Sequence, residues 1–306
     1  MVNGNNVTQT HLTNIKSDIS SILNGGLTDS NIAAAAGIVE SKLAFNLTTG
    51  HHHDAIDSRA ISTGAFRGFI QGAWLNYVAA DQVKADSGVL DIGGTLYTRT
   101  SYSTTIDTDT AANWVEGASQ RGVSKLVYVY AYNDSGTSWD VKYWLQPPLY
   151  ANTITDDSSN KIYRQSGTVW YRMLGTVWLD ATGSGNIVPF YQDGDDMFYD
   201  GNREDTDLRF VNAAAAGAYV LQTITQIPTT CKSVTVSAQN NAAGPTGVFL
   251  SIDGSTDWCV SPEGSLGGTN SVVTLNSIPC PNQQVYAKSN VNAYSLYVRN
   301  YRMGIR

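Results

Sequence analysis

The sequence predicts a mainly β fold, in which a short N-terminal helical segment precedes two β-sandwich domains of jelly-roll type. Only 15% of the 306 residues are charged, whereas threonine, serine, asparagine, glycine and tyrosine are abundant, which is typical of strands and turns. After residue 62, apolar and polar residues alternate in most runs, as they do in strands. These runs are uneven in length and their connections are long, so a sandwich is favoured over a barrel.

Residues 1–61 are expected to form the helical anchor of the chain. Apolar residues recur there at steps of three and four, which predicts a helix of about four turns. One narrow stripe cannot bury itself, so it needs the following domain or copies of itself. Two consecutive glycines end this helix, and an alanine-rich second helix is expected from about residue 30 to residue 43. The stripe comprises Val7, His11 or Leu12, Ile15, Ile19 and Ile22 or Leu23.

Two sets of strand-like runs follow the anchor, separated by the acidic stretch 194–207. We therefore expect one β-sandwich domain over residues 62–202 and a C-terminal one over residues 203–306. The first set comprises residues 88–98, 125–134, 138–145, 161–167, 169–180 and 186–192. The second set comprises residues 208–211, 218–224, 231–239, 246–253, 271–276, 283–289 and 293–305.

Charge and hydropathy exclude several classes of partner. The net charge is −7, so the protein's field repels nucleic-acid phosphates and anionic lipids, and we expect no nucleic acid partner. No apolar run approaches the roughly 20 residues that span a bilayer, so we expect no membrane insertion. The first residues lack a basic and hydrophobic signal peptide, which predicts synthesis in a cytoplasm without cleaved export.

The sequence predicts a protein that is not an enzyme. It contains no nucleophile-elbow, dinucleotide-binding, P-loop or zinc-protease motif. No histidine lies beyond residue 53, so a catalytic triad in the β region has no base of its own. Cys231, Cys259 and Cys280 are few and lack metal-ligand spacing, and we interpret them as small buried or edge hydrophobic residues.

Three stretches together resemble bacteriophage virion proteins of the fibre or appendage type, found on heads or tails. The first is IAAAAGIVESKLAFNLTTGHHHDAIDSRAI, residues 32–61, in which ESKL, GHxHD and DSxxI follow one another as in such fibre proteins. The others are LVYVYAYNDSGTSWDVKYWLQPP, residues 126–148, and YRMLGTVWLDATGSGNIVPFYQDGD, residues 171–195, which match more loosely. The resemblance covers about residues 27–200.

The resemblance implies a homotrimeric structural protein located in the virion and made in the host cytoplasm. Its N-terminal part is expected to attach to other virion proteins of capsid, neck or tail, and its β-domains to face the host surface. A bacterial surface glycan is then a candidate partner. The alternative function is a carbohydrate-binding, lectin-like receptor-binding module. A polysaccharide depolymerase is disfavoured because no repeat of the kind that builds a solenoid is visible.

The histidine run at 51–53 is the candidate metal site. In an extended strand, His51 and His53 point to one face while His52 points to the other. On a threefold axis, His51 and His53 of three chains give six imidazole nitrogens, which suit a divalent transition ion such as Fe or Ni. The resemblance supports this reading, since phage fibres bind metal through His-X-His strands. Two alternatives remain: a plain surface turn, or hydrogen bonds from histidine to Asp54 or Asp57.

Acidic and aromatic residues supply the weaker candidates. Asp193, Asp195 and Asp196, with Glu204, Asp205 and Asp207, offer calcium ligands or paired carboxylates, but a solvated connector between domains is favoured. The sequence around Asp253 and Asp257 predicts a hairpin turn. Exposed tryptophans bind sugar rings by stacking, and Trp258, beside a turn, is the residue expected to be exposed. Most of Trp139, Trp144, Trp170 and Trp178 are expected at core or subunit-interface positions, because they alternate along strands.

Overall fold

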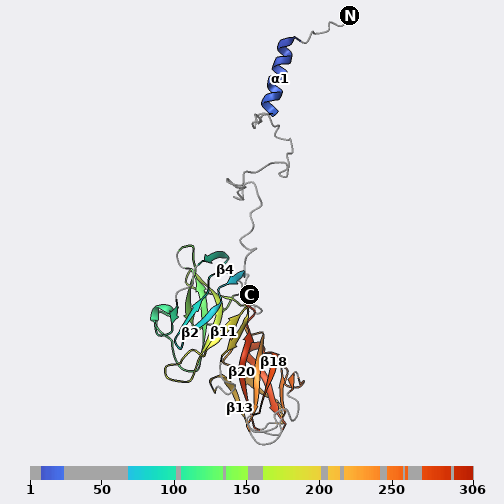
Figure 1. Ribbon diagram of the computed structural model, residues 1–306. Coiled ribbons are helices and arrows are strands. Elements are labelled where there is room, and N and C mark those ends of the chain that lie inside the picture. The colour runs from blue at the N-terminus through green and yellow to red at the C-terminus, as the bar shows by residue number, and fades with distance from the viewer. Residues whose placement is uncertain are drawn as a thin grey trace. The chain divides into compact units, whose positions relative to one another are not determined.

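The computed structural model describes residues 8–23, 68–100, 105–133, 136–150, 161–200, 206–213, 217–241, 247–257, 259–260, 271–290 and 293–305 (Figure 1). The fold is mainly β, as the sequence predicts, with one α-helix and otherwise antiparallel strands in the described residues. The contacts of the chain divide into two units, Met1–Ile61 and Ser62–Arg306. Each unit is described by itself below.

The helix α1 (Gln9–Leu23) confirms the first expected helix. Thr8 caps it: the Thr8 hydroxyl accepts from the His11 backbone N–H at 3.3 Å, and the His11 ring accepts from the Thr8 backbone N–H at 3.3 Å. This reciprocal pair resembles a capping box and satisfies donors that a helix start leaves open. Leu12, Ile15 and Ile19 are all about half exposed, so the predicted apolar stripe exists. The second expected helix, residues 30–43, lies outside the described residues.

Three smaller antiparallel sheets belong to the β unit. One has the order β1 (Ile70–Gly72), β4 (Gly88–Ile92), β5 (Thr95–Arg99). The second has the order β8 (Asp140–Trp144), β7 (Lys125–Tyr132), β10 (Val169–Leu179), β9 (Tyr163–Ser166). The third has the order β14 (Val220–Thr223), β19 (Gln284–Ser289), β16 (Val248–Ser251), β17 (Cys259–Val260). Short 3₁₀ turns lie at Ala111–Asn113, Thr206–Leu208 and Pro281–Gln283.

The large sheet contains nine strands drawn from most of the β unit. Its order is β18 (Val272–Pro279), β15 (Ser233–Asn240), β20 (Tyr294–Arg302), β12 (Asp196–Tyr199), β11 (Phe190–Asp193), β2 (Leu75–Ala79), β3 (Gln82–Ala85), β6 (Ile106–Asp107), and β13 (Arg209–Ala213) also pairs with β20. Strands from both sides of residue 202 therefore share one sheet, joined where β12 pairs with β20. The division into domains 62–202 and 203–306 stays a prediction.

The acidic stretch after residue 192 forms a hairpin where the sequence favoured a solvated connector. β11 and β12 pair with Asp193 opposite Asp196, and Gly194 takes a positive φ of 60° in the turn between them, a backbone region that glycine enters without strain. Met197 and Tyr199 are buried in the core. The expectation of a connector was wrong here, because partly exposed and buried residues alternate along Asp196–Tyr199 as they do in a half-buried strand.

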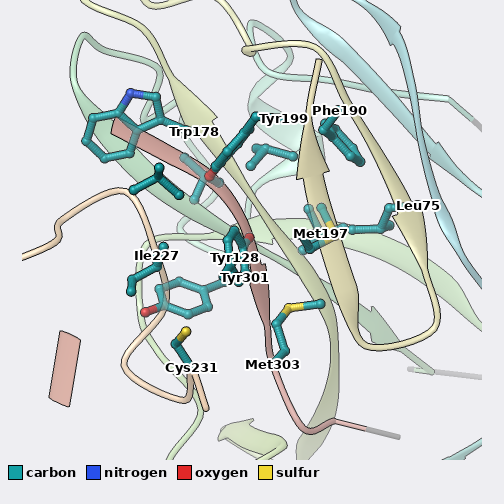
Figure 2. Packing of buried hydrophobic residues seen from close by; sticks show 14 of the residues in the cluster. Leu75, Tyr128, Trp178, Phe190, Met197, Tyr199, Ile227, Cys231, Tyr301 and Met303 are labelled. Carbon is teal, nitrogen blue, oxygen red and sulfur yellow. The ribbon is translucent and has the colours of Figure 1, made fainter. Parts of the chain in front are cut away.

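The four-stranded sheet of β7, β8, β9 and β10 packs face to face on the large sheet as a β-sandwich. At Gly175 of β10, an added Cβ would lie 2.8 Å from Cδ1 of Leu75 on β2, so the two sheets approach too closely there for a side chain. Gln192 on β11 donates to the Leu174 carbonyl at 3.0 Å. Figure 2 shows Leu75, Phe190, Met197, Tyr199 and Tyr301 in the buried cluster between the sheets.

A buried polar network ties together the beginning and the end of the described β unit. Arg172 on β10 is fully buried and donates to Tyr163 Oη at 3.3 Å, to the Gly68 carbonyl at 2.9 Å and to the Ile305 carbonyl at 2.5 Å. The Tyr163 hydroxyl donates to Asp91. Burial lowers the pKa of Arg172 and raises the pKa of Tyr163 to about 12.

Candidate functional site

The outer face of the large sheet carries exposed aromatic side chains. Tyr191 on β11 and Phe198 on β12 are cross-strand partners, so their side chains point to the same face. Their neighbours along the strands, Phe190 and Met197, are buried on the core side. Tyr191 is 55% exposed, which is far more than a tyrosine needs for its hydroxyl to reach water. This face therefore presents large apolar rings to solvent.

Tyr191 and Phe198 form a parallel stack. Their ring centroids lie 4.5 Å apart with an interplanar angle of 3°, the offset-stacked geometry that aromatic pairs favour. The residue opposite Tyr191 on β2 is Asn76, and the residue opposite Phe198 on β20 is Asn300. The stack is thus flanked on both sides by asparagines, whose side chains are smaller than an aromatic ring.

Trp74 extends this aromatic face. It is 41% exposed, whereas the following Leu75 is 1% exposed, so Trp74 and Asn76 lie on the same outer face. The Asn76 side chain donates to the Trp74 carbonyl at 3.3 Å, and the Trp74 carbonyl also accepts from the Asp86 N–H at 2.8 Å. These bonds hold the backbone that carries the indole.

A polar groove of about 310 Å³ begins at the Phe198 end of the stack. The strand registers explain its composition, because Phe198, Asn300 and Thr235 lie in one row across β12, β20 and β15, and Asp196, Arg302 and Ser233 lie in the next row. Asn276 and Ser277 of β18 complete the lining. The full lining consists of Asp196, Phe198, Ser233, Thr235, Asn276, Ser277, Asn300 and Arg302.

An ion pair fixes the charged end of this groove. Arg302 donates from Nε to Asp196 Oδ1 at 3.1 Å and from Nη2 to Asp196 Oδ2 at 2.8 Å. The hydrogen bonds that Arg302 donates to Asp196 raise the pKa of Arg302. A guanidinium has five N–H donors in a rigid plane, and the pair uses two of them. Together, Trp74, Asn76, Tyr191, Phe198, Thr235, Asn300 and Arg302 are called the Tyr191 surface below.

The chemistry of the Tyr191 surface suits binding of a sugar. A pyranose offers an apolar ring face, which stacks on an aromatic ring, and hydroxyls, which pair with amide, hydroxyl and guanidinium groups. Cleavage of a glycosidic bond needs two carboxylic groups placed on either side of that bond. Among the residues that line the groove, Asp196 is the carboxylate, and it is engaged by Arg302. This arrangement favours binding over hydrolysis.

The predicted metal site does not fall within the described part of the chain. The proposed ligands, His51 and His53, lie outside the described residues, as does His52 between them. Trp258, the tryptophan expected to be exposed, also lies outside them. Those expectations stay predictions. The hairpin at Asp253 and Asp257 is confirmed, since β16 pairs with β17 across it and Asp253 Oδ1 accepts from the N–H groups of two residues in the turn.

The tryptophans predicted for the core lie there. Trp139, Trp144 and Trp178 are buried, and Trp170 packs partly buried against the same core. Trp170 also fills the space above the β4–β5 turn, where a Cβ on Gly93 would meet its ring at 2.6 Å.

Three carboxylates that the sequence analysis did not single out meet between loops. Ligand oxygens of Asp81, Asp107 and Asp109 lie within 4.8 Å of one another. Arg121 pairs with Asp109 at 2.5 Å and also donates to the Gly185 carbonyl at 2.8 Å. Arg121 thus links Asp109 of this cluster to the backbone at Gly185.

Comparison with protein-family models, with curated proteins and with solved structures finds no match for this chain. The helix of the described residues is too short and too polar to cross a membrane. The functional interpretation of this chain therefore depends on its own residues.

Proposed function

We propose that this chain is a non-enzymatic fibre or decoration subunit of a bacteriophage virion, which binds a bacterial surface glycan through the Tyr191 surface. The observation that carries the binding role is the exposed parallel stack of Tyr191 on Phe198 beside a hydrogen-bonding groove. The virion role is supported by the resemblance of residues 32–61 and of the two β stretches to phage fibre proteins.

Leaving such a stack exposed to water forgoes a favourable free energy of burial. Burying a tyrosine or phenylalanine ring contributes about 1.5–3 kcal/mol, and exposed apolar clusters on soluble proteins commonly mark interaction sites. The neighbouring groups are hydrogen-bonding amides and hydroxyls, which pair with the hydroxyls of a sugar. A sugar matches both the aromatic stack and the hydrogen-bonding groups of this surface.

The test is titration of the full-length chain with a panel of purified bacterial capsular and cell-wall polysaccharides. We expect saturable binding to at least one polysaccharide without release of reducing ends. Release of reducing ends would show an enzyme and overturn the non-enzymatic role. No binding across the panel, while the protein stays folded, would argue against the glycan role and leave attachment to the particle as the function.

Trimerisation is part of this proposal and is supported by the exposed stripe of α1. Leu12, Ile15 and Ile19 form one exposed apolar face, and Ile22 or Leu23 continues this stripe in the sequence of the helix, which suits a self-associating bundle. Light scattering should give a mass about three times that of one chain. The Ile15→Asp variant should shift toward single chains, whereas Thr13→Asp, away from the stripe, should not. An Ile15→Asp variant that keeps the wild-type mass would contradict self-association through this stripe.

A metal ion at His51 and His53 on the trimer axis remains proposed, with Fe or Ni as the expected ion. Elemental analysis of the purified trimer should find about one ion per three chains. The double variant His51→Ala, His53→Ala should lose the ion, and His52→Ala should keep it, because alternate residues of a strand face opposite ways. A metal-free wild-type trimer would remove the metal from the account.

A further inference from the structure

Strand pairing brings two cysteines to the same end of the large sheet. β15 and β18 are antiparallel partners, and their last register pair joins Ser233 to Pro279. Cys231 precedes the start of β15 by two residues, and Cys280 directly follows the end of β18. The backbone on the Cys231 side is held by a turn in which the Cys231 N–H donates to the Pro228 carbonyl at 3.0 Å. Both thiols thus sit on fixed backbone.

The two sulfur atoms lie 3.0 Å apart. That separation is closer than two non-bonded sulfurs normally rest, and a disulfide of about 2.05 Å needs only a small further approach. Cys231 is 5% exposed and Cys280 is 0% exposed; Figure 2 shows Cys231 among the buried residues of the core. Both are free thiols in this structure.

We propose that Cys231 and Cys280 are a site of oxidative modification, which closes an intrachain disulfide when the protein meets a small-molecule disulfide such as oxidised glutathione. The pair reacts in this way whether or not the Tyr191 surface binds a glycan.

A cavity supplies the route for the oxidant. Cys231 lines a cavity of about 620 Å³, together with Lys161, Lys232 and Asn282, whereas Cys280 is not among its lining residues. The two lysines favour the carboxylates of oxidised glutathione by charge. The geometry therefore assigns different roles to the two cysteines: Cys231 reacts with the oxidant that enters the cavity, and Cys280 then attacks the Cys231 sulfur from inside the core.

The reaction balances as two successive thiol–disulfide exchanges. The Cys231 thiolate attacks one sulfur of oxidised glutathione, forming a mixed disulfide and releasing one glutathione thiolate. The Cys280 thiolate then attacks the Cys231 sulfur and releases the second glutathione. Two electrons pass from the protein thiols to the glutathione sulfurs, and the two thiol protons end on the released glutathione molecules.

Burial sets the rate of this reaction. Desolvation raises the pKa of Cys231 far above its usual range, and only the thiolate attacks a disulfide. Oxidation is therefore slow at neutral pH and accelerates as the pH rises. Once formed, the link fastens β18, which is the terminal strand of the large sheet, to its neighbour β15.

The experiment incubates the folded full-length chain with oxidised glutathione and maps the cysteines by peptide mass spectrometry after rapid alkylation. Wild-type protein should yield the Cys231–Cys280 linked peptide, and its melting temperature should rise by roughly 5–10 °C. Cys280→Ser should stop at the mixed disulfide and carry one glutathione on Cys231. Cys231→Ser should leave Cys280 unmodified, because Cys280 does not reach the cavity.

Several outcomes would overturn the proposal. They are two free thiols at Cys231 and Cys280 after prolonged oxidation at pH 8 to 9, a link from either residue to Cys259, or glutathione on Cys280 in the Cys231→Ser variant. A Cys259→Ser chain serves as the matched control, since it should form the Cys231–Cys280 link as the wild type does. If a serine variant fails to fold, the linked peptide of the wild-type chain alone decides the matter.

Discussion

Two aromatic clusters of this protein use similar residues and contacts but differ in their surroundings. In the core, Tyr130 on β7 meets Trp144 on β8 at 5.6 Å and Tyr171 on β10 at 6.3 Å, both edge to face. On the outer face of the large sheet, Tyr191 and Phe198 stack in parallel at 4.5 Å. Tyr130 is fully buried and its hydroxyl donates to the Gln146 carbonyl at 2.8 Å, whereas Tyr191 is mostly exposed.

The difference separates rings that stabilise the fold from rings that are available to a ligand. Edge-to-face rings interlock and fill space, and the core hydroxyl is already satisfied by a carbonyl. The parallel stack lies on the outer face of the large sheet between Asn76 and Asn300, and its Tyr191 ring is 55% exposed. Ring contacts alone do not distinguish these cases, but burial and the chemistry of the neighbours do. The predictions below test that separation.

The largest effect is expected at the centre of the core cluster. Tyr130→Ala removes a fully buried ring and should lower the free energy of unfolding by about 4 kcal/mol, measured by urea denaturation. Tyr130→Phe keeps the ring and loses only the hydrogen bond to Gln146, so it should cost about 1 kcal/mol. A loss below about 1 kcal/mol for Tyr130→Ala would mean that this cluster is not the core of the sandwich.

The next effect is an alkaline loss of stability that comes from buried tyrosines. Burial raises the pKa of Tyr163 to about 12, while an unfolded tyrosine ionises near pH 10. The folded state therefore holds its proton more tightly, and this contribution is complete below pH 10 and is lost as the pH rises to 12. Two pKa units correspond to about 2.7 kcal/mol. Denaturation at pH 9 and pH 11.5 measures it, and equal stability at both would contradict the buried network.

A smaller effect is expected in the groove beside the exposed stack. Asn300→Ala removes one amide next to Phe198 and should weaken glycan binding about fivefold, the value of one hydrogen bond near 1 kcal/mol. Calorimetric titration measures the change. Asn212→Ala, on β13 away from the groove, should leave the affinity unchanged; equal losses for both variants would show that Asn300 has no specific part in binding.

The smallest effect on stability is expected at the exposed stack itself. Tyr191→Ala should change the free energy of unfolding by no more than about 0.5 kcal/mol, because a surface ring contributes little to folding. Thermal or urea denaturation of this variant beside Tyr130→Ala compares the two clusters directly. A loss comparable to that of Tyr130→Ala would make the Tyr191 stack part of the fold and remove the reason to expect a ligand there.

Much of this fold follows from alternation in the sequence. The runs that became β7, β8, β9, β10, β15 and β20 all alternate or are continuously apolar, and turn residues bound them, so local sequence predicts them well. The predicted run 186–192 includes most of β11, but β12 is not predicted, because the aspartates around Gly194 obscure the alternation that buries Met197 and Tyr199. The strands β2 and β3 are not predicted because they have only five and four residues, too few for a clear alternation.

The candidate site was harder to predict than the strands. Alternation shows that Tyr191 and Gln192 face opposite sides of β11, but it does not show which side meets the core, and here the glutamine is the buried one. The neighbours of Tyr191 in space come from β2, β12 and β20, whose order in the sheet is set by long-range pairing. The same holds for Cys231 and Cys280, which are far apart in sequence and adjacent only through the β15–β18 register.

The most direct test of the glycan-binding role compares three chains in calorimetric titrations with the polysaccharide that the wild type binds. Tyr191→Ala should weaken binding about tenfold, the loss of roughly 1.4 kcal/mol of ring stacking. Leu221→Ala, which truncates another exposed apolar residue, on β14, should bind as the wild type does. An unchanged affinity in a folded Tyr191→Ala chain would contradict the account, because the stack would then have no part in recognition.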